Sequence, residues 1–96
     1  SARRSALSRW TSSEIRAAVV DIIAPDLNRA GIAAAALDDK LDLLEGGILD
    51  SFAYLDMIMA LEQRTGISID LAAIDDQPIG TVGGLVRAVH ELDGEA

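Results

Sequence analysis

Apolar residues recur at helical spacing in three stretches of this chain. The first stretch, residues 11–25, reads TSSEIRAAVVDIIAP. Its apolar positions form the single face that an amphipathic helix requires, and they are Ile15, Val19, Ile22 and Ile23. Thr11 and Glu14 fit the two positions of a capping box, and Pro25 is expected to end the run. The pattern predicts a first helix that begins after Thr11 and ends at Pro25.

The second stretch begins at the Asp50-Ser51 pair and extends to about Arg64, and Gly66 is placed as a C-terminal cap. The residues expected to face the core are spaced three apart along it, and they are Leu55, Ile58 and Leu61. This stretch predicts a second helix whose first turn carries an aspartate and a serine.

The third stretch, residues 81–92, reads TVGGLVRAVHEL, and Thr81 offers an N-cap. One side of the expected helix is apolar, with Val82, Leu85, Val86 and Val89. Gly83 and Gly84 weaken a helix by about 1 kcal/mol each relative to alanine, so tertiary packing has to hold this one.

Weakly periodic connections separate these helices. Residues 26–50 form a long loop in which GIAAAALDD could hold a short helical turn, and a second turn is expected near residues 71–76. A loop of that length inside a small domain usually has a function. We therefore predict an all-α fold, a small four-helix bundle with three long helices and one short one, and a long loop between helices 1 and 2. Residues 1–10 are expected to be a flexible basic tail, 11–92 the folded domain and 93–96 a C-terminal tail.

Composition and charge narrow the function. The chain has 96 residues, half of them apolar but only three aromatic, which suits small packed helices better than a large substrate pocket. Residues 38–76 carry ten acidic residues against two basic ones, and they account for the whole formal charge of −8. Nucleic-acid binding needs the opposite sign. The acidic middle instead favours basic protein partners, although plain solvation of the surface explains the charge equally well.

Several kinds of chemistry are excluded. The chain has no cysteine, so it has no disulfide, no catalytic thiol of its own and no cysteine metal site. No segment is apolar enough to span a bilayer and no signal peptide is visible, so we expect a cytoplasmic monomer. Leu49 and Ala53 flank Ser51 where a hydrolase elbow needs glycines. Leu43 breaks a weak calcium-loop pattern at Asp38, Lys40 and Asp42, and His90 is expected at the surface.

The segment LLEGGILDSFAYLDMIMALEQRTGISI, residues 43–69, resembles the signature of acyl and peptidyl carrier proteins. The resemblance rests on Gly46–Gly47, Asp50–Ser51, Phe52, the MALE run at residues 59–62 and the ISI run at 67–69. The flanking helices agree with it, and it covers roughly residues 11–92. The chain differs from the commonest family pattern in having Phe52 in place of leucine. Its GILDS segment is more similar to freestanding or acyl-type carriers, D-alanyl carriers included.

The resemblance implies that a phosphopantetheinyl transferase attaches the 4′-phosphopantetheine arm of coenzyme A to Ser51, with Asp50 helping that enzyme to recognise the site. The thiol of the arm would carry an acyl or aminoacyl group as a thioester in fatty acid, polyketide or nonribosomal peptide biosynthesis. The chain itself would then be no enzyme and would have no catalytic residue. From the residues alone, Asp50 or Ser51 can equally be a simple N-cap worth about 1 kcal/mol, and capping does not exclude attachment.

Helix geometry places one mixed stripe along the second helix, with Phe52, Asp56, Met59 and Gln63. The resemblance implies that this stripe is the docking surface for the loading and accepting enzymes, whose own surfaces would be basic. Phe52 could instead belong to the core, and Tyr54 could be a surface contact or a cover for the long loop. The alternative to a carrier is an unmodified acidic helical interaction module. Residues 1–10 could be a docking extension, a linker remnant or an artefact.

Overall fold

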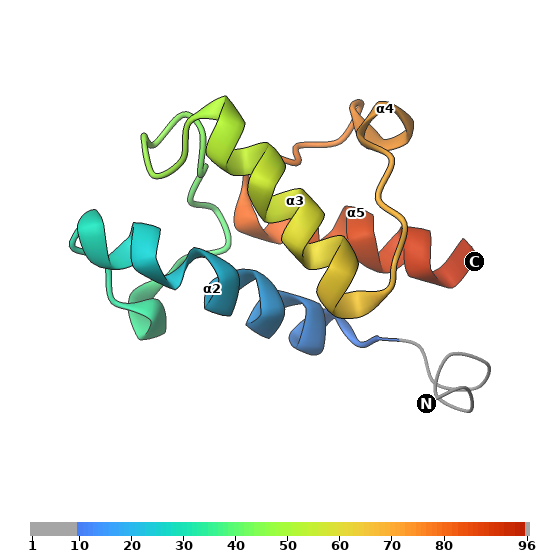
Figure 1. Ribbon diagram of the computed structural model, residues 1–96, viewed down its shortest axis with the longest axis horizontal. Coiled ribbons are helices and arrows are strands. Elements are labelled where there is room, and N and C mark those ends of the chain that lie inside the picture. Colours follow the sequence, from blue (N-terminus) through green and yellow to red (C-terminus); the bar gives the residue numbers. More distant parts are fainter. Residues whose placement is uncertain (1–9, 96) are drawn as a thin grey trace.

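The computed structural model describes residues 10–95, and within them it is built from helices and loops (Figure 1). Three helices are long, namely α2 (Ser12–Arg29), α3 (Ser51–Thr65) and α5 (Val82–Glu95), and α4 (Leu71–Ile74) is a single turn. A 3-10 turn, η1 (Ala34–Ala36), lies in the long loop between α2 and α3. The predicted all-α fold with three long helices and one short one is confirmed, as are both short turns. The basic tail falls almost wholly outside the described residues.

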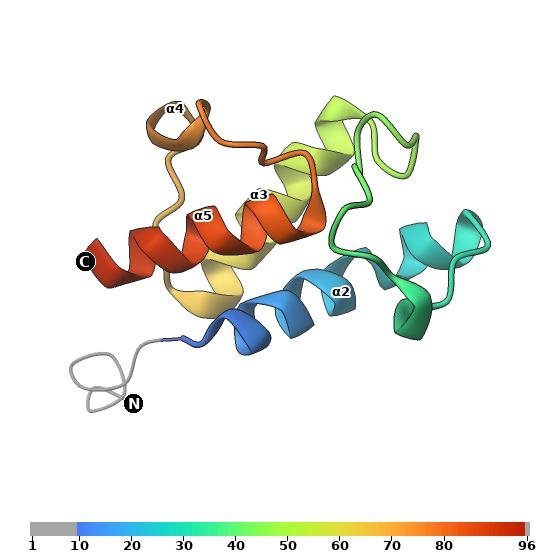
Figure 2. The ribbon, with the colours of Figure 1, turned by 180° about the vertical axis from the view of Figure 1, so that it is seen from behind.

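Helix α2 packs against both α3 and α5 and so holds the bundle together. Helix α3 crosses the front of the molecule in Figure 1, and the reversed view in Figure 2 shows α5 in front instead. The apolar sides of the three helices meet between these faces. Burying an aliphatic side chain there contributes about 2 kcal/mol. The largest fully buried side chains are Ile15, Val19, Ile23, Leu27, Leu43, Leu61, Val82, Leu85 and Val89.

The prediction that the first helix ends at Pro25 is wrong, because α2 continues through the proline to Arg29. Proline has no N–H to donate and costs a helix interior about 3 kcal/mol. Pro25 itself is exposed, whereas Ile23 and Leu27 on either side of it are buried at 0% and 1% exposure. Burial of these two side chains offsets the cost of the proline, so packing overrides the local signal.

The predicted core stripe of α3 is wrong at one position, because Leu55 is 47% exposed. Ile58 and Leu61 are buried as predicted. The buried face has the i, i+3, i+4, i+7 spacing of a helix and lies one residue earlier in register than expected, with Tyr54, Met57, Ile58, Leu61 and Thr65. Gly66 ends the helix in the left-handed conformation, as predicted, with φ 76°.

Close packing explains the glycines at the start of α5. A Cβ atom on Gly84 would lie 2.0 Å from the carbonyl oxygen of Pro78, so the backbones approach too closely for any side chain. The N–H of Gly84 donates to the Thr81 hydroxyl at 3.1 Å, which confirms the predicted cap. At its other end α5 runs to Glu95, past the expected boundary at residue 92. Residues 93–95 are therefore helical, and Asp93 accepts a 2.7 Å hydrogen bond from the backbone N–H of Trp10.

Candidate functional site

The first turn of α3 presents Ser51 to solvent. Asp50 is the N-cap, and its Oδ1 accepts a hydrogen bond from the N–H of Ala53 at 2.8 Å. Ser51 is the first helical residue and is exposed. Among the described residues no acceptor is recorded for the N–H groups of Ser51 and Phe52. The exposed serine hydroxyl thus lies at the positive end of the helix dipole beside two available donors, which favours a negative group there.

The loop before Ser51 is fixed by backbone geometry. The Oδ1 atom of Asp42 accepts from the N–H groups of Leu44 and Glu45 at 3.0 and 2.8 Å. A Cβ atom on Gly46 would lie 2.6 Å from the carbonyl oxygen of Asp42, and Gly47 has φ 76°. The two glycines therefore permit a tight turn that residues with side chains could form only under strain.

Two buried side chains anchor this loop to the core. Ile48 and Leu49 follow the turn at 9% and 4% exposure, and their N–H groups both donate to the carbonyl oxygen of Leu43. Leu43 itself is fully buried, and its N–H donates to the carbonyl oxygen of Gly80 at 2.8 Å. The Asp50–Ser51 pair is accordingly held between an anchored loop and a packed helix.

Tyr54 connects α3 to the segment that precedes α5. Its side chain is 4% exposed, and its hydroxyl donates to the carbonyl oxygen of Ile79. Burial raises the pKa of Tyr54 to about 12, and the negative charge of Asp42 acts in the same direction. Neither a surface contact nor a loop cover, the two alternatives raised from the sequence, describes this core side chain one turn from Ser51. Its position three residues after the serine, on the buried face, was the signal that sequence reasoning missed.

All four residues of the mixed stripe lie on the surface of α3. Phe52 is 81% exposed and Met59 is 53% exposed, so Phe52 does not belong to the core. Asp56 and Gln63 are exposed beside them. The structure adds two apolar side chains that the sequence did not assign to this surface, Leu55 and Leu44, at 47% and 39% exposure.

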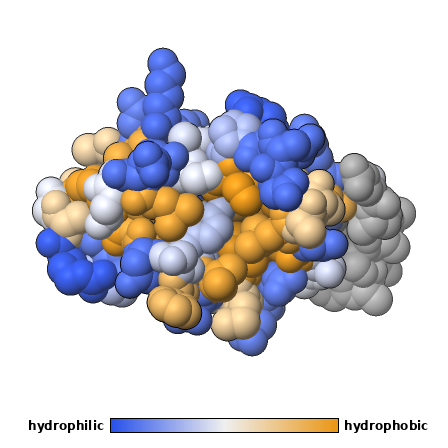
Figure 3. Space-filling view, turned by 90° about the horizontal axis from the view of Figure 1, so that it is seen from above, coloured by the Kyte–Doolittle hydropathy of each residue, from blue (hydrophilic) through white to orange (hydrophobic). Residues whose placement is uncertain are grey.

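Single exposed leucines are ordinary, but four large apolar side chains near one helix start form a patch suited to protein contact. Seen from above, the molecule shows apolar areas bordered by hydrophilic residues (Figure 3). We call Leu44, Phe52, Leu55 and Met59 the apolar patch.

The other candidates from the sequence stay apart from this site. His90 is exposed on α5, as expected. No group of three or more metal-ligating side chains is found among residues 10–95, and the weak calcium-loop pattern thus forms no such cluster there. None of the helices in this part of the chain has the length and apolar character needed to cross a bilayer.

Comparison with known proteins agrees with this geometry. The family model described as "Phosphopantetheine attachment site" matches residues 17–89, and the chain belongs to this family. A D-alanyl carrier protein of Bacillus velezensis is 25% identical over 79 residues, which cover 82% of this chain and 97% of the relative. A D-alanyl carrier protein of Bacillus licheniformis is 29% identical over 52 residues, covering 54% and 67%. No solved structure gives a significant match.

The protein is thus a carrier protein and not an enzyme, and its family's cofactor is covalently attached 4′-phosphopantetheine. The residues present fit that group. It requires an accessible hydroxyl, and a phosphodiester at a helix start is stabilised by free N–H groups and the dipole. The start of α3 offers both.

Proposed function

We propose that the protein carries its 4′-phosphopantetheine arm on Ser51 and delivers a thioester-bound acyl or aminoacyl group between partner enzymes. One observation supports this assignment most directly. Residues 17–89 contain two serines, Ser51 and Ser68, and of these only Ser51 opens a helix. It is exposed and directly follows the N-cap Asp50.

Loading of Ser51 is a group transfer carried out by a phosphopantetheinyl transferase with coenzyme A. The hydroxyl oxygen of Ser51 bonds to the phosphorus that bears pantetheine, the phosphoanhydride bond to 3′,5′-ADP breaks, and the hydroxyl proton leaves to a base of the transferase. The N–H groups of Ser51 and Phe52 favour the resulting phosphodiester by about 0.3–1 kcal/mol through the helix dipole. The bound arm supplies the thiol that this cysteine-free chain lacks.

Asp50 has two roles in this proposal. Its Oδ1 caps α3, while no hydrogen bond is recorded for its Oδ2 among the described residues. The second oxygen is therefore available to the transferase, which we propose recognises the site through this carboxylate. Asn would preserve the cap and remove the charge, which makes the two roles separable.

The cargo is proposed from the relatives. Both are D-alanyl carrier proteins by name, which supports a small aminoacyl group as the cargo of this chain as well. Tethering the cargo raises its effective concentration at each partner, so the chain contributes to the reaction without catalysing it.

The docking surface is proposed to be the stripe of Phe52, Asp56, Met59 and Gln63, widened by the rest of the apolar patch. Exposed aromatic and thioether side chains are adaptable contacts, and the carboxylate of Asp56 favours a basic partner surface. The alternative, an unmodified interaction module, would use the same surface without an arm. Loading of Ser51 therefore decides between the two.

Intact-protein mass spectrometry tests the assignment. The chain is incubated with coenzyme A, magnesium and a broad-specificity phosphopantetheinyl transferase, and we expect a gain of one phosphopantetheine. Ser51→Ala should abolish the gain. Ser68→Ala tests the other serine of the matched segment, and Ser12→Ala tests the serine that opens α2; both should load normally. A folded wild-type chain that gains no mass, or a Ser51→Ala chain that still gains it, would contradict the proposal.

A further inference from the structure

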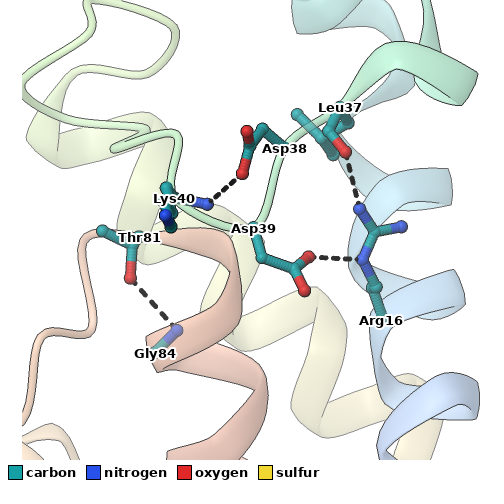
Figure 4. Close-up of polar contacts among 7 residues, drawn as sticks. All are labelled: Arg16, Leu37, Asp38, Asp39, Lys40, Thr81 and Gly84. Atoms are coloured by element: carbon teal, nitrogen blue, oxygen red, sulfur yellow. Dashed lines mark hydrogen bonds and ion pairs between the residues drawn. The ribbon is translucent and has the colours of Figure 1, made fainter.

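A groove of about 710 Å³ lies between the first turns of α2 and α5 and the loop at residues 39–40. Arg16 comes from α2, Asp39 and Lys40 from the loop, and Arg87 and His90 from α5. Figure 4 shows the loop lying between the two helices here. The groove lies in the layer of α2 and α5, while α3 crosses the other side of the molecule (Figures 1 and 2). It is separate from the first turn of α3.

The groove collects the positive charge of an acidic protein. The described residues contain five Lys and Arg side chains, and three of them line the groove. The other two, Arg29 and Arg64, lie elsewhere and are paired with Asp26 and Asp21. Arg16 pairs with Asp39 at 2.7 Å, and Asp39 is the single acidic residue of the lining.

Two cations of the groove have no carboxylate partner. No ion pair within residues 10–95 involves Lys40 or Arg87, and both side chains are exposed. With Arg16 and Asp39 cancelling each other, the lining has a net charge of two positive units, to which a protonated His90 adds. An anionic ligand would find its strongest local attraction on the described surface at this groove.

Backbone geometry argues against a compact anion such as phosphate. The first N–H groups of α5 are all occupied: Val82 donates to Leu41 at 3.1 Å, Gly83 to Asp39 at 2.8 Å, and Gly84 to the Thr81 hydroxyl at 3.1 Å. A phosphate cradle at a helix start needs such donors free. Recognition here depends instead on long cationic side chains spread along an open groove.

The walls of the groove are firmly held. Arg16 donates to the carbonyl oxygen of Leu37 at 2.8 Å as well as to Asp39, and this joins the loop to α2 (Figure 4). The bond from Gly83 to Asp39 joins the same loop to α5. Between the cations the lining also has apolar surface, from Pro78 and Val86. A preorganised groove of this kind loses little entropy on binding.

We propose that this groove binds an acidic peptide segment of a partner protein, with carboxylates on Lys40 and Arg87 and an apolar side chain against Pro78 and Val86. The acidic surface around it repels an acidic segment elsewhere and so restricts binding to the groove. Because α3 lies on the other side of the molecule, a partner held here leaves the start of α3 accessible. The proposal does not depend on modification of Ser51.

The test is an NMR titration of the full, isotope-labelled chain with a synthetic peptide of alternating leucine and glutamate. We expect chemical-shift changes concentrated at residues 16, 39–40 and 83–90, and weaker binding as salt is added. The double variant Lys40→Glu with Arg87→Glu should weaken binding about tenfold or more, since two attractive pairs become repulsive. Arg29→Glu with Arg64→Glu makes the same change in net charge outside the groove and should leave the affinity within about twofold.

Further arms separate this proposal from its competitors. Ser51→Ala should bind the peptide like the wild type, whatever the outcome of the loading experiment. A glutamine-for-glutamate peptide should bind much more weakly. The proposal is overturned if the shifts fall on α3, if the control double variant loses affinity equally, or if no binding occurs. It is also overturned if inorganic phosphate binds the groove in place of the peptide, or if sedimentation shows self-association that the Lys40/Arg87 variant abolishes.

Discussion

Helices α2 and α3 begin in the same way, with a capping residue followed by an exposed serine. Thr11 precedes Ser12, and Asp50 precedes Ser51. The start of α2 is a closed capping box, in which the Thr11 hydroxyl accepts from the N–H of Glu14 at 3.1 Å and the Glu14 carboxylate accepts from the N–H of Thr11 at 3.0 Å. The matching position in α3 is Ala53, which gives no reciprocal bond.

The surroundings of the two serines differ more than the caps do. Ser12 lies on the lining of the cationic groove and falls before the segment that matches the family, residues 17–89. Ser51 is followed by the 81% exposed Phe52, where α2 has Ser13. One turn further, the buried residue is Ile15 in α2 and Tyr54 in α3. A serine at a helix start is therefore common chemistry, and the acidic cap and apolar patch are what single out α3.

The largest effect is expected for Asp50→Asn. Asn is as good an N-cap as Asp, so the free energy of unfolding should change by less than about 0.5 kcal/mol. The initial rate of loading by the transferase should fall about 30-fold, the consequence of losing one charged contact worth about 2 kcal/mol. Mass spectrometry of timed samples and urea unfolding measure the two quantities. Thr11→Asn is the matched control at α2 and should load at the wild-type rate. An unchanged rate for Asp50→Asn would reduce this aspartate to a cap.

A somewhat smaller effect is expected for Phe52→Ala. Phe52 is almost fully solvated, so its removal should alter stability by less than about 0.5 kcal/mol. If its ring is an anchor of the docking surface, affinity for a partner should fall about tenfold. Titration of the transferase against each variant measures this, with Ser13→Ala as the control at the corresponding position of α2. Wild-type affinity in Phe52→Ala would remove this ring from the docking surface.

The smallest effect is expected for Tyr54→Phe, which removes the hydroxyl that α2 lacks at Ile15. Loss of the hydrogen bond to Ile79 should lower the free energy of unfolding by about 1 kcal/mol at neutral pH.

This effect carries a pH signature. The pKa of Tyr54 is about 12 in the folded chain against an ordinary 10, so the folded state keeps a proton that the unfolded state releases. That contribution is fully present below pH 10 and is lost as the pH rises from 10 towards 12. Urea unfolding at several alkaline pH values should show a steeper decline for the wild type than for Tyr54→Phe. Equal slopes would mean that Tyr54 does not titrate in this way.

Most of the fold could be predicted because helix signals act locally. The capping box at Thr11, the left-handed cap at Gly66 and the Thr81 cap are confirmed, since each depends on residues within one turn. The errors at Pro25 and Leu55 arise from packing. The burial of Ile23 and Leu27 carries α2 through the proline, and the register of α3 against α2 decides which leucine is buried.

The candidate site was partly predictable for the same reason. Exposure of Ser51 and Met59 followed from a single helix, whereas the core position of Tyr54 requires a partner from far along the chain at Ile79. The cationic groove was not predictable, because its walls come from three segments between residues 12 and 90. Sequence patterns report what one element does, and only the folded chain shows what several elements form together.

The hydrogen bond from the Trp10 N–H to Asp93 brings the two ends of the folded unit to one place. In Figure 1 both ends lie at the right of the molecule, while α3 begins at the upper left. A linker fused to either end would therefore hold the domain like a pendant, with Ser51 on the far side from the tether. The same closeness makes a circular permutant feasible, in which a short glycine-rich bridge joins residue 95 to residue 10 and new termini open in the surface loop after α2.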